Sequence, residues 1–251
     1  MNGVGPSPRC DEIGVGYGGI RRPDPAIERA IETALDGARR IVNIGAGTGS
    51  YEPAGRSIAA VEPSAVMIGQ RSSALAPAVQ AVAEELPLAK GAADAALAVL
   101  TVMHWGDLAR GLAEMRRVAS KTVILTIDPE VVAQLWIIKD DAPETALTHV
   151  ASLPSIKDLA AAFPEARVRT VLVPRRCTDG FMAAFWGRPE AYLDPEIRRA
   201  TSPWHQITKS TADRAIHRLS MDLADGTWDG RYGHLRSAPT HDVGLGLVIG
   251  G

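Results

Sequence analysis

The chain has 251 residues, 46% of them apolar, so it is long enough to bury a sizeable hydrophobic core in one domain. The formal net charge of -2 gives no general attraction to nucleic acid or to an anionic membrane surface. Composition and charge therefore indicate a globular protein and disfavour a nucleic-acid or membrane partner.

Cysteine and histidine usage indicates neither a disulfide framework nor a metal centre. Cys10 and Cys177 are far apart and form no CxxC pair, which fits a reducing cytoplasm. No two of the six histidines have ligand spacing on one helix face, so we predict no metal. The first residues lack the apolar segment of a secretion signal, and no stretch reaches the length of a bilayer span without charges. We expect a cytoplasmic protein.

A helix is predicted directly after Asp24. Asp24 is a good N-cap, Pro25 suits the first helical position, and the apolar residues from Ile27 to Leu35 share one face.

A buried strand, a glycine loop and a second strand ending on a carboxylate follow from Ile41 to Glu62. Gly45, Gly47 and Gly49 come where the first strand must turn, and glycine lets the backbone approach a ligand closely. The second strand, 57–61, delivers Glu62 to the same edge of the sheet, where a carboxylate can accept hydrogen bonds from ribose hydroxyls. The link between the strands leaves room for a helix of one or two turns at most.

The glycine spacing separates two kinds of nucleotide site. A dinucleotide fold uses G-x-G-x-x-G. This chain has G-x-G-x-G, with Ser50 at the position of the third glycine. A nicotinamide-nucleotide enzyme is therefore disfavoured.

The remaining sequence alternates further strands and helices. We predict strands at 79–83, 94–102, 122–127, 168–173 and 243–249, and helices at 65–71, 107–119 and 155–163. A long helical section is predicted over 179–225, including a helix capped by Ser210. The strand at 94–102 brings His104 to the ligand edge, where it is the best candidate for a general base; the alternative is that His104 and Trp105 form a structural plug.

The segments VNIGAGTG, VEPS, AEELPL and VLTVMHW, in this order, resemble class I S-adenosylmethionine-dependent methyltransferases. The resemblance covers about 24–128 and is greatest to the small-molecule group that includes the ubiquinone and menaquinone-biosynthesis enzymes. It implies a Rossmann-like doubly wound α/β sheet, mostly parallel with an antiparallel last strand, plus a helical cap. The chain would be one domain, 1–251, with a cofactor-binding core at 24–128 and cap segments at 129–166 and 175–240.

The same resemblance implies which residues bind S-adenosyl-L-methionine. They are Gly45, Ala46, Gly47, Gly49, Ser50, Tyr51, Glu62, Pro63, Met67, Ala83, Glu84, Leu100 and Tyr17. Tyr17 would lie on an N-terminal lid or else pack as a surface aromatic, and Met67 is alternatively a core methionine. Two positions depart from the family pattern: Val82 stands where an acid usually binds adenine, and Asn43 stands where Asp is common.

The section from Pro129 to Trp204 holds seven aromatic residues, which suggest either an apolar substrate chamber or the core of a cap. They are Trp136, Phe163, Phe181, Phe185, Trp186, Tyr192 and Trp204. Asp179, Arg188 and Glu190 could orient a substrate or be ordinary helix caps and surface charges. The resulting hypotheses are methyl transfer to a small, mostly apolar metabolite, a methyltransferase-like binding protein or cyclase, and, least favoured, a nicotinamide enzyme.

Overall fold

The computed structural model describes residues 21–251 and contains a seven-stranded sheet with the order β3-β2-β1-β4-β5-β9-β6. Its strands are β1 (Ile41–Ile44), β2 (Ser57–Val61), β3 (Ala78–Val79), β4 (Ala93–Val99), β5 (Ala119–Ile127), β6 (Arg167–Thr170) and β9 (Leu245–Gly250). The first five are parallel, and β9 runs antiparallel between β5 and β6. The predicted fold class is confirmed.

Helices cover both faces of the sheet. The helices of this layer are α3 (Pro25–Leu35), α4 (Ala65–Gly69), α5 (Leu108–Val118), α6 (Pro129–Val132) and α8 (Ile156–Ala161). Successive strand residues face opposite sides: Leu97 and Val123 pack with α3, whereas Ala96 and Ile124 pack with α5 and α8. The sheet is therefore buried on both faces, as its near-continuous apolar strands predict.

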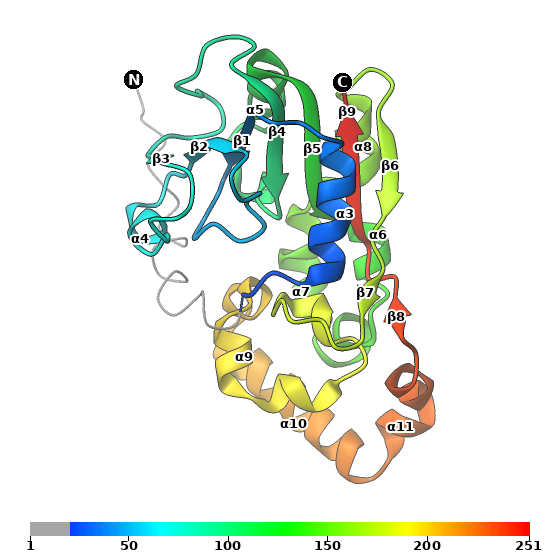
Figure 1. Cartoon of the computed structure of the whole chain (residues 1–251). Coiled ribbons are helices and arrows are strands. Elements are labelled where there is room, and N and C mark those ends of the chain that lie inside the picture. The colour runs from blue at the N-terminus through cyan, green and yellow to red at the C-terminus, as the bar shows by residue number, and fades with distance from the viewer. Residues whose placement is uncertain (1–20) are drawn as a thin grey trace.

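Most of the remaining chain forms short helical turns beyond the carboxyl end of β4 (Figure 1). The elements are η1 (Val102–His104), η2 (Ile137–Asp141, a π-helix), α7 (Glu144–Thr148), η3 (Val150–Ser152), η4 (Met182–Phe185), η5 (Pro189–Leu193), α9 (Pro195–Arg199), η6 (Ser202–Gln206), α10 (Lys209–Ala224), α11 (Thr227–Tyr232) and η7 (Gly233–Arg236). The two-stranded antiparallel sheet of β7 (Val173–Pro174) and β8 (Thr240–His241) joins this region to the main sheet.

The helical section predicted over 179–225 is broken into several pieces. Pro189 and Pro195 each begin a new short element, and Pro203 is the second residue of another, because proline lacks the N–H that would continue a preceding helix. The longest helix, α10, is capped by the Thr208 hydroxyl, which accepts a hydrogen bond from Thr211 N at 3.2 Å. The prediction of Ser210 as its cap is wrong by two residues.

Other differences concern the ends of elements. The link between β1 and β2 contains turns and no helix, because Pro53 and Gly55 interrupt an already short crossover. The strand predicted to run to Val102 ends at Val99, since Leu100 has a φ of 50°. The strand at 79–83 is reduced to Ala78–Val79 at the sheet edge, and that at 168–173 is split into β6 and β7. Among the described residues, no helix has the length and apolar character needed to cross a bilayer.

The antiparallel strand β9 packs closely against the segment after α8. A Cβ added to Gly250 would lie 2.6 Å from Phe163 Cβ, so we expect Gly250→Ala to destabilise the fold by about 1–3 kcal/mol through overpacking. Urea denaturation of both variants would measure this. Gly230→Ala, at an open position in α11, is the control and should be neutral or slightly stabilising. Equal stabilities for the two variants would contradict this view of the β9 packing.

Candidate functional site

The predicted site residues gather at one edge of the sheet. Because β3, β2, β1 and β4 are adjacent and parallel, the loops that follow them meet at their carboxyl ends. The glycine loop follows β1, Glu62 and Pro63 follow β2, Ala83 and Glu84 follow β3, and Leu100 follows β4. Tyr17 lies outside the described residues.

The carboxylate of Glu62 contacts the glycine loop directly. Gly47 N donates to Glu62 Oε2 at 2.8 Å, and Ser64 N donates to Glu62 Oε1 at 2.9 Å. The Glu62 side chain is buried, and two backbone amides fix its orientation. Each carboxylate oxygen has two lone pairs, so the group can accept further hydrogen bonds from a bound ligand.

The glycines of the loop have different surroundings. Gly45 and Gly47 both have positive φ, 64° and 53°, as expected for the turn. A Cβ added to Gly47 would meet nothing within 4 Å, so the backbone there borders open space. A Cβ added to Gly45 would lie 2.0 Å from Thr101 Oγ1. The missing side chain of Gly45 therefore makes room for Thr101, and the contact of the Gly45 backbone with a ligand stays a prediction.

A buried polar network supports the loop from beneath. Asn43 Nδ2 donates to Glu52 Oε2 at 3.1 Å, and Arg71 Nη2 donates to the same oxygen at 2.7 Å. Ala76 N donates to Glu52 Oε1 at 2.9 Å. Asn43 thus replaces the usual acid at its position while Glu52 supplies a carboxylate next to it. The Glu52 carboxylate is therefore engaged by protein groups.

The Glu52–Arg71 pair should be important for stability. Their side chains are only 1% and 5% exposed, so Arg71→Met would leave a buried carboxylate without its cation. We expect a loss of about 3–5 kcal/mol in the free energy of unfolding, measured by urea denaturation. The exposed pair of Arg199 and Glu196 provides the control, since Arg199→Met should cost less than about 1 kcal/mol. Similar losses in the two variants would show that burial of the first pair has no special effect.

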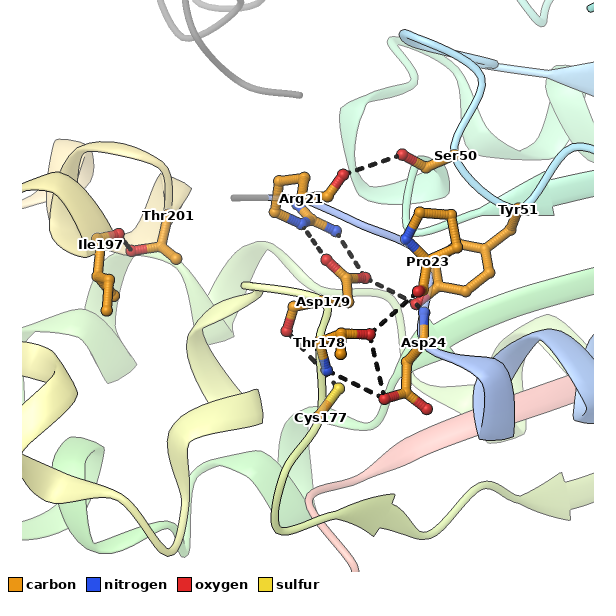
Figure 2. Close-up of polar contacts among 10 residues, drawn as sticks. All are labelled: Arg21, Pro23, Asp24, Ser50, Tyr51, Cys177, Thr178, Asp179, Ile197 and Thr201. Carbon is orange, nitrogen blue, oxygen red and sulfur yellow. Dashed lines mark hydrogen bonds and ion pairs between the residues drawn. The ribbon is translucent and has the colours of Figure 1, made fainter. Parts of the chain in front are cut away.

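Tyr51 ties the glycine loop to two distant segments (Figure 2). Its hydroxyl accepts a hydrogen bond from Asp24 N and donates one to Asp179 Oδ2, both at 3.0 Å. Burial, and next the negative charge of Asp179, raise the pKa of Tyr51 far above its ordinary value. The hydroxyl of this predicted cofactor-binding residue is therefore engaged by protein groups.

Asp179 completes this junction. Arg21 Nε lies 2.6 Å from Asp179 Oδ1, and both side chains are largely buried. Thr178 N donates to Asp24 Oδ2 at 3.0 Å, which fastens the same segment to the start of α3 (Figure 2). Asp179 thus joins the segment before α3, the glycine loop and the region beyond β7.

The other two polar residues considered for substrate contacts are also engaged by protein groups. Glu190 pairs with Arg236, and Arg188 donates hydrogen bonds to the Cys177 and Ala184 carbonyl oxygens.

Glu84 and Leu100 each make hydrogen bonds near the ends of η1. Glu84 Oε1 accepts hydrogen bonds from Gly106 N and Asp107 N, at 2.6 and 3.0 Å, and so holds the turn before α5. Leu100 N donates to Leu125 O at 2.8 Å. His104, the candidate base, is exposed at the end of η1. Ala46, Met67 and Ala83 are buried, whereas Gly49, Ser50 and Pro63 are half-buried.

His149 is a residue that the sequence treats only as one of several scattered histidines. Gln206 Nε2 lies 3.2 Å from His149 Nδ1, so η6 contacts the end of α7 at this point. Burial, and next the influence of His104, lower the pKa of His149 to about 4. The structure thus brings His104 and His149 into electrostatic range, although 44 residues separate them in sequence and no spacing rule connects them.

The aromatic residues beyond Pro129 pack mainly on one another. Trp136 and Phe185 each contact Tyr192 edge to face, with ring centroids 5.5 and 5.7 Å apart. Six of the seven share one buried cluster, and Phe163 lies in the other cluster under the sheet. This arrangement fits the core interpretation. The described residues hold no group of three His, Cys, Asp or Glu side chains that could bind a metal ion.

One carboxylate of this region is strongly perturbed. Asp141 is 5% exposed, and its Oδ1 has no hydrogen-bond partner among the described residues. Burial, and then the neighbouring Asp222 and Asp140, raise the pKa of Asp141 to about 7, while Arg218 and Arg231 act in the opposite direction. Asp141 also ends η2, a π-helix, which is an uncommon backbone form.

The raised pKa predicts a pH-dependent stability. Between about pH 4 and 7 the folded protein keeps a proton on Asp141 that the unfolded chain has lost, so this residue lowers stability as pH rises. We expect Asp141→Asn to be more stable than the wild type by about 1–3 kcal/mol at pH 8 and to show little gain at pH 4. Urea denaturation at both values measures this, with Asp213→Asn on the exposed face of α10 as control. A gain independent of pH would contradict the assignment.

Known proteins with a similar sequence or fold include methyltransferases. Residues 42–127 match the family described as a methyltransferase domain. A crystal structure of an Anabaena variabilis protein, provisionally described as a methyltransferase from an antibiotic biosynthesis pathway, superposes with a TM-score of 0.83 at 26% identity. The match covers 92% of this chain and 99% of that one. The fold is that of a methyltransferase.

Two other solved structures share the methyltransferase fold at lower similarity. The YcgJ protein of Bacillus subtilis has a TM-score of 0.50 at 15% identity, covering 89% of this chain and 95% of its own. The [4+2]-cyclase SpnF has a TM-score of 0.50 at 17% identity, covering 98% and 96%. These identities support the fold alone. No curated protein matches the chain significantly.

Proposed function

We propose that this protein transfers the methyl group of S-adenosyl-L-methionine to a small, mostly apolar metabolite. The observation that carries the proposal is the pairing of the buried Glu62 carboxylate with the open backbone at Gly47. The methyltransferase fold and the matching domain support it. We further propose a cytoplasmic enzyme with no nucleic-acid partner, related to the group that includes the quinone-biosynthesis methyltransferases.

The residues present fit this cofactor. Glu62 would accept hydrogen bonds from the ribose hydroxyls, since its two oxygens are already oriented by Gly47 and Ser64. The bare backbone at Gly47 would adjoin the amino-acid part of the cofactor, and Met67 and Ala83 would border its adenosine. When bound, the cofactor supplies an electrophilic methyl group on a sulfonium.

The chain's own task is to position the acceptor and exclude water, because methyl transfer is an in-line displacement. His104 stands beyond the carboxyl end of β4, on the same edge of the sheet as the glycine loop. We propose that its imidazole accepts the proton of a hydroxyl or amine acceptor, a role suited to a group whose ordinary pKa is near neutrality.

The second candidate is a methyltransferase-like protein that binds the cofactor, or has lost it, and does not transfer methyl groups. Val82 and Asn43 favour it, since both occupy positions where related enzymes usually carry an acid. The SpnF cyclase shows that the fold occurs in a protein described by another reaction. Transfer of a labelled methyl group from the cofactor to a metabolite extract separates the two candidates, because the second predicts none.

Calorimetry with S-adenosylhomocysteine tests the cofactor site. We expect Glu62→Gln to weaken binding about 10- to 100-fold, because the ribose would lose a charged acceptor. Glu85→Gln, at an exposed position nearby, should bind like the wild type. Thermal unfolding of each variant checks that the fold is intact. The proposal would be overturned if the wild type failed to bind S-adenosylhomocysteine, or if a folded Glu62→Gln variant bound it as tightly as the wild type does. A separate titration with NADH tests the nicotinamide alternative, which a change in NADH fluorescence would favour.

A further inference from the structure

We infer that the hydrogen bond from the Tyr51 hydroxyl to Asp179 holds the glycine loop in the form that binds the cofactor, so that Tyr51 is a positioning residue. The inference deepens the proposed function and rests on it. It makes the affinity for the cofactor depend on the segment 177–179, which leads from β7 into the helical region.

The glycine loop connects Tyr51 to the open backbone at Gly47 through consecutive turns. Gly49 N donates to Ala46 O at 2.9 Å, and Glu52 N donates to Gly49 O at 3.2 Å. Gly47, whose backbone borders open space, lies in the first of these turns, and Tyr51 lies in the second. Because Gly49 belongs to both turns, the position of Tyr51 constrains the position of Gly47.

The backbone of Tyr51 has an unusual conformation for a residue with a large side chain. Its φ is 60°, in the left-handed region that favours glycine. Such a conformation persists only where the surrounding structure holds it in place. The ring of Tyr51 is buried in the same core cluster as Ile27 and Ile31 of α3. The buried ring and the contacts of its hydroxyl supply the restraint at this end of the loop.

The hydroxyl of Tyr51 lies between two partners of opposite kind (Figure 2). Asp24 N can only donate, and it lies 3.0 Å from the hydroxyl oxygen. The hydroxyl proton is therefore donated to Asp179 Oδ2, also at 3.0 Å. Burial, and next the negative charge of Asp179, raise the pKa of Tyr51 far above its ordinary value, so the hydroxyl keeps this proton at physiological pH.

Asp179 is itself fixed by contacts outside the loop. Arg21 Nε donates to Asp179 Oδ1 at 2.6 Å, and the backbones of these two residues form an isolated antiparallel bridge. Thr178 N donates to Asp24 Oδ2 at 3.0 Å. The segment that carries Asp179 is thus fastened to the start of α3. It provides a fixed point against which the Tyr51 hydroxyl holds the loop.

Calorimetry with S-adenosylhomocysteine measures the effect of the hydroxyl on the cofactor site. We expect Tyr51→Phe to bind this probe about 5- to 20-fold more weakly than the wild type, because the loop loses its hydrogen bond to a buried carboxylate. Thermal unfolding checks that each variant is folded.

Tyr232→Phe is the matched control. It also loses a hydrogen bond from a tyrosine hydroxyl to an aspartate, Asp140, but it lies in α11, at the far end of the helical region from β1 and β2 (Figure 1). It should bind S-adenosylhomocysteine like the wild type. Equal affinities of folded Tyr51→Phe and Tyr232→Phe would overturn the inference.

A double-mutant cycle tests Asp179 as the partner of Tyr51. Asp179→Leu removes the acceptor of the hydroxyl, so we expect it to weaken binding of S-adenosylhomocysteine at least as much as Tyr51→Phe does. The double variant should bind no more weakly than Asp179→Leu alone, because both substitutions remove the same hydrogen bond. Losses that multiply in the double variant would overturn the assignment of Asp179.

Amide hydrogen exchange, followed by NMR, gives a readout that does not require a folded Asp179 variant. In the free protein we expect the Asp24 and Gly49 amides to exchange faster in Tyr51→Phe than in the wild type, because the first loses its acceptor and the second the restraint on its turn. Exchange at Gly49 that is equal in the two proteins would contradict a hold of Tyr51 on the loop.

The same measurement detects the coupling from the other side. If the junction raises the affinity for the cofactor, a bound cofactor must strengthen the junction by the same factor. Saturating S-adenosylhomocysteine should therefore slow the Asp24 amide of the wild type by about 5- to 20-fold. The Thr227 amide, bonded to Asp225 at the start of α11, should not change. An Asp24 amide that does not respond to binding would overturn the inference.

The two proposals fail in different ways. If the wild type does not bind S-adenosylhomocysteine, the proposed function fails, while exchange at Gly49 in the free protein still reports whether Tyr51 holds the loop. If the wild type and folded Tyr51→Phe bind it alike, only the role of Tyr51 fails.

Discussion

The candidate site depends on one hydrogen bond between the segments that follow β1 and β2. Gly47 N donates it to the Glu62 carboxylate. It fixes the glycine loop against the end of β2 and keeps a negative charge at the sheet edge. A buried carboxylate is costly unless it is hydrogen-bonded, and Ser64 N provides its second donor. The geometry of the loop and the orientation of the acid are therefore set together.

The crossover between β1 and β2 replaces the usual helix with polar contacts. Twelve residues separate the two strands, and they form turns around Pro53 and Gly55. A loop without a helix must satisfy its backbone groups in other ways. Here Glu52 accepts from Asn43, Arg71 and Ala76 N, so a single buried side chain connects the loop to β1 and to the segment before β3.

The sheet and the position of the loop could be predicted because apolar strands and glycines act locally. Residues 41–44, 57–61 and 122–127 carry patterns that predict strands without reference to distant contacts, and each range lies within an observed strand. The contacts of Thr101 with Gly45, of Arg71 with Glu52 and of Gln206 with His149 could not be predicted in this way. Each depends on a pairing between segments far apart in sequence, for which neither periodicity nor motif spacing carries a signal.

The junction of Arg21, Tyr51 and Asp179 has a consequence for how such proteins can be recombined. One residue precedes α3, one belongs to the glycine loop, and one lies beyond β7, yet each depends on the others to satisfy a buried charge or hydroxyl. A chimera that imports the helical region of a relative would bring a foreign residue opposite Tyr51. The residues at positions 21, 51 and 179 should therefore be exchanged together in any chimera that is to fold.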